Sequence, residues 1–207
     1  MDIKVITPQF IREAYKKIDA AFFSRDDKPF NLNIWGIRSA DMTSDKYNDF
    51  IGFTYIFNGK YFHKVFVATT DPGLYYLKNP MNSAGAPLLV HDKQYRGVYQ
   101  FGKHNPGKPT EHDALRQIKP MTYWRDNNRD DYRDCDGPIH TSLSFTNLHS
   151  RKPGSSMLAT IGKTSAGCQV IASPSIYFAD FIPVVKAAIP YWGDKFTYTL
   201  FFEPTIL

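Results

Sequence analysis

The chain has 207 residues, of which 43% are hydrophobic and 15% aromatic, enough to build one sizeable core. A charged fraction of 22% is ordinary for a folded protein and argues against global disorder. The formal net charge of +5 favours polyanionic partners such as cell wall, nucleic acid or a membrane surface, without choosing among them. Basic residues are spread along the chain, so nucleic acid is not the expected partner. No apolar run reaches the roughly 18 residues that a membrane span needs, so we expect no membrane span.

The N-terminal segment, residues 1–30, predicts one helix packed on the rest of the chain. Thr7 can cap this helix, and Pro8 suits its first position. Apolar residues recur at helical spacing from Phe10 to Phe22. We therefore expect an amphipathic helix that ends shortly after Phe22.

Most of the following chain predicts strands and turns. Asn58-Gly59 lies between two apolar runs, which is the strongest short-range signal of a β-hairpin. Residues 102–113 and 125–138 have the composition of loops. The expected strands are 33–39, 51–57, 60–70, 88–90, 95–101, 121–124, 143–150 and 196–202.

A second helix is expected near the C-terminus. Residues 175–189 carry apolar side chains at helical spacing, and Pro183 within them predicts a kink or a break. The chain shows no internal repeat and no clear linker. It is therefore expected to be one mainly β domain over residues 1–207, with a helix near each end.

The segment around Cys168 has the features of a nucleophile. Cysteine catalysis needs a thiol, a nearby base and donors for the developing oxyanion. Ser165-Ala166-Gly167-Cys168 predicts a tight turn, in which Gly167 permits an unusual backbone angle and close approach of a substrate carbonyl. Backbone N–H groups around Gly167 and Cys168 would then face the substrate oxygen.

Three histidines are candidates for the cavity around this thiol. In the expected strand 143–150, every second residue from Leu143 to His149 lies on one face, which places His149 at the end of a core-facing strand. We favour His149 as the base, and His140 remains the alternative. His104 is a candidate for the cleft wall, or else a solvated loop residue.

The same residues resemble the catalytic motif of the L,D-transpeptidases, in which a His is followed by a short segment and then by Ser/Thr-His-Gly-Cys. Asn147-Leu148-His149 and Ser165-Ala166-Gly167-Cys168-Gln169-Val170 stand in those places. This variant of the motif is similar to that of phage-encoded and bacterial members. A less specific resemblance extends over roughly residues 35–200. Two departures stand out: Ala166 replaces the motif His, and Gln169-Val170 replaces a hydrophobic residue followed by Arg or Asn.

The resemblance implies a mainly β catalytic fold, either a sandwich or a mixed sheet, and an enzyme that acts on peptidoglycan stem peptides without a cofactor. Cys168 would be acylated at the carbonyl of the L-centre of a diamino acid, with His149 as base and with Ser165, Gly167 and Asn147 in supporting or oxyanion-binding roles. An amine would complete a cross-link, and water would complete hydrolysis; the sequence leaves both open. The alternative is a catalytically silent wall-binding or phage virion module with the same fold.

Other features of the sequence do not predict a metal site. Asp126, Asn128 and Asp130 form D-x-N-x-D, the opening of a calcium loop, but the sixth position is Asp131 and the twelfth is Gly137, so the pattern fails. We therefore expect a solvated acidic turn there. No paired Cys or His at zinc-binding spacing is present.

The remaining cysteine, Cys135, lies in an acidic run that disfavours a thiolate, so we expect it to be unreactive and unbridged to Cys168. The implied substrate lies in the cell envelope, whereas the N-terminus has no signal-peptide pattern. Two explanations stay open: the sequence is a processed form, or the protein is delivered by a phage.

Overall fold

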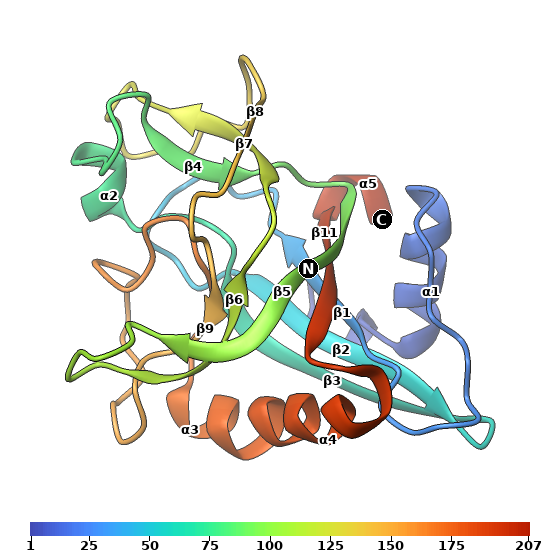
Figure 1. The fold of residues 1–207 in the computed structure, drawn as a ribbon. Coiled ribbons are helices and arrows are strands. Elements are labelled where there is room, and N and C mark those ends of the chain that lie inside the picture. Colours follow the sequence, from blue (N-terminus) through green and yellow to red (C-terminus); the bar gives the residue numbers. More distant parts are fainter.

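The computed structural model describes all residues from Met1 to Leu207 and is mainly β, as expected. Its main element is a closed barrel of eight strands, beside which lies a separate sheet of three (Figure 1). In order around the barrel, the strands are β1 (Asn33–Arg38), β11 (Lys195–Phe202), β5 (Lys93–His104), β6 (His112–Gln117), β9 (Leu148–His149), β10 (Gln169–Ile171), β3 (Lys60–Thr69) and β2 (Asp49–Phe57). The small sheet has the order β4 (Ala86–Leu89), β7 (Met121–Asp126) and β8 (His140–Ser142).

Closure of the barrel distinguishes this architecture from the sandwich or mixed sheet that the resemblance implied, and the sandwich is not confirmed. β1 pairs in parallel with β11, the last strand of the chain, and antiparallel with β2. Because the β1–β11 pair that closes the barrel joins strands far apart in the sequence, no local sequence pattern could predict it.

The predicted hairpin is confirmed. β2 and β3 pair in register up to Phe57 and Lys60, with Asn58 and Gly59 as the two turn residues. Their φ angles are +50° and +71°, the left-handed conformation that a two-residue turn of this type needs at both positions.

The N-terminal helix α1 (Pro8–Lys17) begins as predicted but ends earlier. The Thr7 hydroxyl accepts a hydrogen bond from the Phe10 N–H at 3.1 Å, which caps the helix. Phe22 lies beyond the helix and packs edge-on against Tyr15, with ring centroids 5.4 Å apart. Its helical spacing therefore reflected a contact made from the following loop.

The C-terminal helical segment is continuous from Pro174 to Trp192 and is distorted, rather than broken, directly before Pro183. It consists of α3 (Pro174–Ile176), a π-helical turn η2 (Tyr177–Phe181) and α4 (Ile182–Trp192). Pro183 has no N–H to donate to the preceding turn, and the π-turn stands directly before it. Buried residues of these helices, including Tyr177 and Phe181, join the main core of 24 buried residues in the barrel.

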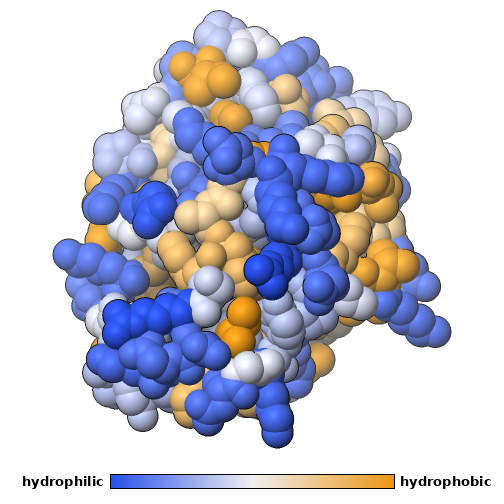
Figure 2. All heavy atoms as spheres, turned by 90° about the vertical axis from the view of Figure 1, so that its right-hand side faces the viewer, coloured by the Kyte–Doolittle hydropathy of each residue, from blue (hydrophilic) through white to orange (hydrophobic).

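The remaining helices are short: η1 (Ile3–Val5), α2 (Leu74–Lys78) and α5 (Glu203–Ile206). None of the helices has both the length and the hydrophobicity to cross a membrane. A second core of eight buried residues lies beneath α1, where Ile11 and Tyr15 meet Trp35 and Phe201. The surface on this side of the molecule carries interspersed hydrophilic and hydrophobic residues (Figure 2).

Three details of the sequence prediction are wrong around the barrel opening. Only Leu148 and His149 form a strand in the segment 143–150, because the chain there crosses from the small sheet to the barrel. Phe145 has a φ of +56° and is 65% exposed, so the expected alternation on a core-facing strand does not exist. The expected loop 102–113 is shorter, since β5 runs to His104 and β6 begins at His112. β6, β8 and β10 were not expected.

Candidate active site

Cys168 lies at the end of a tight turn, directly before β10. The Ser165 hydroxyl accepts a hydrogen bond from the Gly167 N–H at 3.1 Å and donates one to the Cys168 carbonyl at 2.9 Å. Gly167 has a φ of +115°, and a Cβ at this position would lie 2.6 Å from the Pro87 carbonyl oxygen. The turn therefore requires glycine, and Ser165 holds it together.

This arrangement changes the expected oxyanion donors. The Gly167 N–H is engaged with Ser165 and does not face a substrate. The Cys168 N–H has no acceptor within the protein. Of the two donors suggested by the sequence, the Cys168 N–H is the one that remains free.

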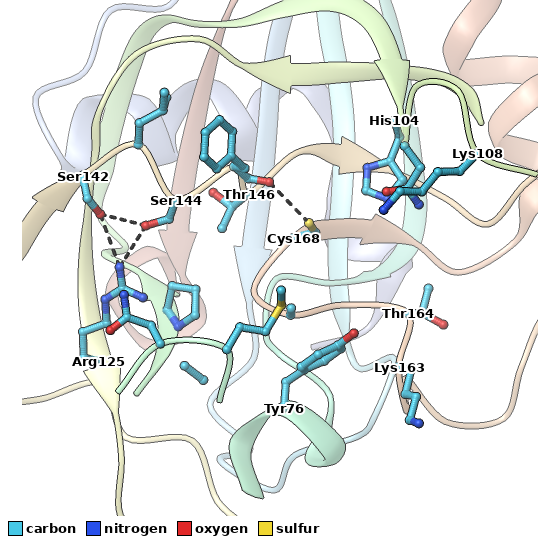
Figure 3. A pocket seen from close by; sticks show the side chains of 18 residues that line it. Tyr76, His104, Lys108, Arg125, Ser142, Ser144, Thr146, Lys163, Thr164 and Cys168 are labelled. Atoms are coloured by element: carbon cyan, nitrogen blue, oxygen red, sulfur yellow. Dashed lines mark hydrogen bonds between the residues drawn. The ribbon is translucent and has the colours of Figure 1, made fainter. Parts of the chain in front are cut away.

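His149 is the last residue of β9, which pairs in parallel with β10. The register places Leu148 opposite Gln169 and His149 opposite Val170, and the Asn147 carbonyl accepts a hydrogen bond from the Gln169 N–H at 2.9 Å. Cys168 therefore directly precedes the strand that neighbours the strand of His149. No hydrogen bond joins the thiol to an imidazole; the Cys168 Sγ instead points to the Phe145 carbonyl oxygen at 4.0 Å (Figure 3).

The hydrogen bonds of His149 select one tautomer. Its Nδ1 lies 2.6 Å from the Ser150 carbonyl oxygen, which can only accept, so Nδ1 carries the proton. Nε2 then bears the lone pair. It has no hydrogen-bond partner, although the residue is only 2% exposed. A buried imidazole nitrogen with a free lone pair is the form that a general base requires.

Two more histidines surround His149 and form with it what we term the histidine cluster: His104, His112 and His149. The His104 ring stacks on the His149 ring with centroids 3.9 Å apart, and His112 lies 5.2 Å and 5.7 Å from the two. Sequence reasoning placed His104 at the cleft but missed His112. These two residues face each other in the β5–β6 pair, a relation that appears only when the register is known.

The electrostatics of the cluster keep every member neutral near pH 7. Burial and the neighbouring His104 hold the pKa of His149 well below its usual range. Burial, with His112 and Lys108 nearby, lowers the pKa of His104 to about 4. Burial also raises the pKa of the Cys168 thiol to about 11. The resting site therefore holds a neutral thiol and neutral imidazoles rather than a thiolate–imidazolium pair.

Asn147 orients His104. Its amide oxygen accepts from the Gln117 N–H at 3.0 Å, and its amide nitrogen lies 3.1 Å from Nδ1 of His104. Nδ1 of His104 is thus an acceptor and its Nε2 carries the proton, so this tautomer presents a donor where a base would need a lone pair. The alternative candidate His140 is exposed on β8 and does not line the cavity of Cys168.

Cys168 opens into a cavity of about 690 Å³ at the junction of the barrel and the small sheet. A second cavity of about 360 Å³ adjoins it and is lined by His112 and His149, with His104 in the wall of both. The first cavity carries Lys108, Arg125 and Lys163 but no Asp or Glu. Sequence reasoning missed these cations, because residues of three separate loops and strands meet only in the folded chain.

Gln169, one of the two motif departures, has a structural role. Its Oε1 accepts from the Tyr198 hydroxyl at 2.9 Å, and its Nε2 lies 3.4 Å from the carbonyl oxygens of both Thr70 and Gly167. Val170, in the same departure, is fully buried, whereas Ala166, at the other departure, is half-buried and lines the cavity of Cys168. Gln169 therefore links the cysteine turn to the barrel core.

Cys135 and Cys168 are both free thiols. Cys135 lies 3.7 Å from Nη1 of Arg38, and burial rather than its acidic neighbours is the main cause of its raised pKa. No group of three or more His, Cys, Asp or Glu side chains has a metal-binding arrangement. In the D-x-N-x-D segment, Asn128 and Asp130 are exposed as expected, but Asp126 is only 2% exposed at the end of β7.

Comparison of the chain with protein-family models, with curated proteins and with solved structures finds no match. Function must therefore be inferred from the site itself.

Proposed function

We propose that the protein is a cysteine-dependent acyl-transfer enzyme that acts on peptidoglycan stem peptides, with Cys168 as nucleophile and His149 as base. One observation carries the proposal. Nε2 of His149, with its free lone pair, is buried in the strand next to β10, and Cys168 directly precedes β10. Cys168 also opens into a cavity large enough for a peptide.

The proposed reaction begins when a substrate carbonyl enters the cavity. The Cys168 sulfur forms a bond to the carbonyl carbon while the thiol proton passes to Nε2 of His149. The oxyanion that develops accepts a hydrogen bond from the free Cys168 N–H. The C–N bond then breaks, the leaving amine takes the proton from His149, and a thioester on Cys168 remains.

The second half-reaction decides the product. An amine or a water molecule attacks the thioester and gives up a proton to Nε2 of His149, and this proton returns to the departing Cys168 sulfur. An amine yields a cross-link, and water yields hydrolysis. The substrate class rests on the resemblance of the two motifs to those of the L,D-transpeptidases.

The neutral resting state fits this scheme. With the thiol pKa at about 11 and the imidazole pKa far below it, proton transfer from Cys168 to His149 is unfavourable in the empty site. Bond formation to the substrate carbonyl must accompany the transfer, so the thiol becomes nucleophilic only when a substrate is bound.

The test is incubation of purified sacculi with the wild type and with three variants, followed by mass analysis of the muropeptides. Cys168→Ala should abolish product formation, and His149→Ala should reduce it by about 100-fold or more, the typical contribution of a general base. The matched control His140→Ala should retain activity, since that ring is exposed on another sheet. Full activity in Cys168→Ala would refute the proposal.

A catalytically silent wall-binding module is the second candidate. It is favoured by the absence of a hydrogen bond between the thiol and any imidazole. Intact mass measurement of the wild type after exposure to stem peptides separates the two functions. An added acyl mass on Cys168 supports the enzyme, whereas retention on sacculi with neither adduct nor product supports the module.

A further inference from the structure

The cavity of Cys168 has an unusual charge pattern. Lys108, Arg125 and Lys163 line it, and none of the three forms a salt bridge with an acidic side chain. Figure 3 shows Arg125 on one side of Cys168, and Lys108 and Lys163 on the other. The cavity therefore has two cationic ends with the nucleophile between them.

Arg125 is the better defined of these ends. Its Nη2 lies 3.0 Å from the Ser144 hydroxyl and 3.4 Å from the Ser142 hydroxyl, and its Nη1 lies 3.4 Å from the Gly85 carbonyl oxygen. The two hydroxyls lie 2.7 Å apart. All partners of this half-buried guanidinium are neutral, and they fix its position at the cavity wall.

A structural arginine in this protein is partnered differently. Arg38 and Arg133 are fully buried and share the carboxylate of Asp71. A partly desolvated cation without a counter-ion is costly, and a guanidinium matches a carboxylate through two parallel hydrogen bonds. Arg125 thus has no carboxylate partner within the protein, and the cavity beside it has room for one from a ligand.

Resting on the proposed function, we infer that the cavity binds a peptide with free carboxylates on both sides of the reacting carbonyl. Arg125, with the Ser142 and Ser144 hydroxyls, forms the site for one carboxylate. Lys108 and Lys163 attract the other; both are exposed, and Lys163 is held over the Tyr75 ring at 4.1 Å. Because these lysines are solvated, their contribution is smaller than that of Arg125.

The experiment measures binding without turnover, in the Cys168→Ala protein, by isothermal titration calorimetry. The probes are a synthetic stem tetrapeptide with free carboxylates and the same peptide with its carboxylates amidated. The free form should bind at least tenfold more tightly. Arg125→Gln should remove most of this preference for the free peptide. Lys108→Gln should reduce the ratio of the two affinities by only about threefold.

Arg12→Gln is the matched control. Arg12 lies on α1, so this substitution removes the same charge at a position away from the cavity. It should leave the preference unchanged. Equal binding of the two peptides, or an Arg125→Gln protein with an intact preference, would overturn the inference. So would displacement of the peptide by inorganic phosphate more readily than by acetate, which would indicate a phosphate site.

The two proposals can fail separately. If wild-type protein yields no new muropeptides while the carboxylate preference depends on Arg125, the binding site stands and the enzyme proposal fails. If sacculi are processed through Cys168 but amidation has no effect on binding, the enzyme stands and the carboxylate site fails.

Discussion

Two buried polar clusters in this molecule resemble each other in burial and differ in how their polar atoms are satisfied. The first, which we term the ionic cluster, consists of Arg38, Asp49, Asp71 and Arg133. Arg38 donates to Asp71 at 2.9 Å and to the Leu89 carbonyl at 2.7 Å, and Arg133 pairs with the other oxygen of Asp71. In the ionic cluster one buried nitrogen, Nε of Arg133, lacks a hydrogen-bond partner, whereas in the histidine cluster Nε2 of both His112 and His149 lacks one and no opposite charge is present.

The main difference between the clusters is therefore the pairing of opposite charges, which gives the ionic cluster a structural role; a chemical role of the histidine cluster is part of our proposal. The ionic cluster keeps its charges because they compensate one another, and it fastens the loop that carries Arg133 to β1 and to the end of β3. The histidine cluster instead stays neutral and keeps lone pairs available. Buried nitrogens without partners reduce stability, and such groups are typical of functional sites.

The largest effect should be the change with pH in the alkylation rate of Cys168, the thiol next to the histidine cluster. In a Cys135→Ser protein, alkylation of Cys168 by iodoacetamide should be slow at pH 7 and rise about tenfold per pH unit, approaching its plateau only near the pKa of about 11. Thiolate is the reactive form, and its fraction rises with pH. A rate that is already at its plateau at pH 7 would show that the cluster stabilises a thiolate.

Breaking the ionic cluster should cost several kcal/mol. Asp71→Ala leaves two buried guanidinium groups without their shared carboxylate, so we expect a loss of about 3–5 kcal/mol in the free energy of unfolding, measured by urea denaturation. Asp41→Ala is a control, since its pair with Lys46 is exposed and should contribute under about 1 kcal/mol. Equal effects of the two changes would contradict the structural role of the ionic cluster.

The smallest effect should be that of a substitution in the histidine cluster on the free energy of unfolding. His149→Gln replaces the ring by an amide whose NH2 can still donate to the Ser150 carbonyl and whose oxygen takes the place of the unpartnered nitrogen, so we expect a change of no more than about 1 kcal/mol in the free energy of unfolding. The same urea titration measures it. A loss comparable to that of Asp71→Ala would mean that His149 is mainly a structural residue.

Local patterns in the sequence predicted what depends on neighbouring residues. The hairpin at Asn58-Gly59, the cap at Thr7, the helix distortion before Pro183 and the turn before Cys168 all follow from the conformational preferences of a few adjacent residues. The pairing of β1 with β11 depends on contacts between distant segments, which no local pattern contains.

The site was predictable to the same extent. The motif predicted Cys168 and His149 as the candidate pair, but it did not predict the residues that surround them. His112 joins the site through the β5–β6 register, and Arg125 through the approach of the small sheet to the barrel. The strand expected over residues 143–150 was wrong because alternation of apolar and polar residues also occurs in an exposed crossing segment, where Phe145 faces solvent.

The parallel pairing of β9 with β10 has a consequence for how such a site can change over time. His149 and Cys168 are held by the backbone ladder between neighbouring strands, and the residues between them form an excursion outside it. The entropy of closing such a loop grows only slowly with its length. Insertions and replacements in this excursion can therefore accumulate and reshape the cavity rim while the side chains of His149 and Cys168 keep their places. The number of residues between the histidine and the cysteine can vary, whereas the register of the two strands cannot.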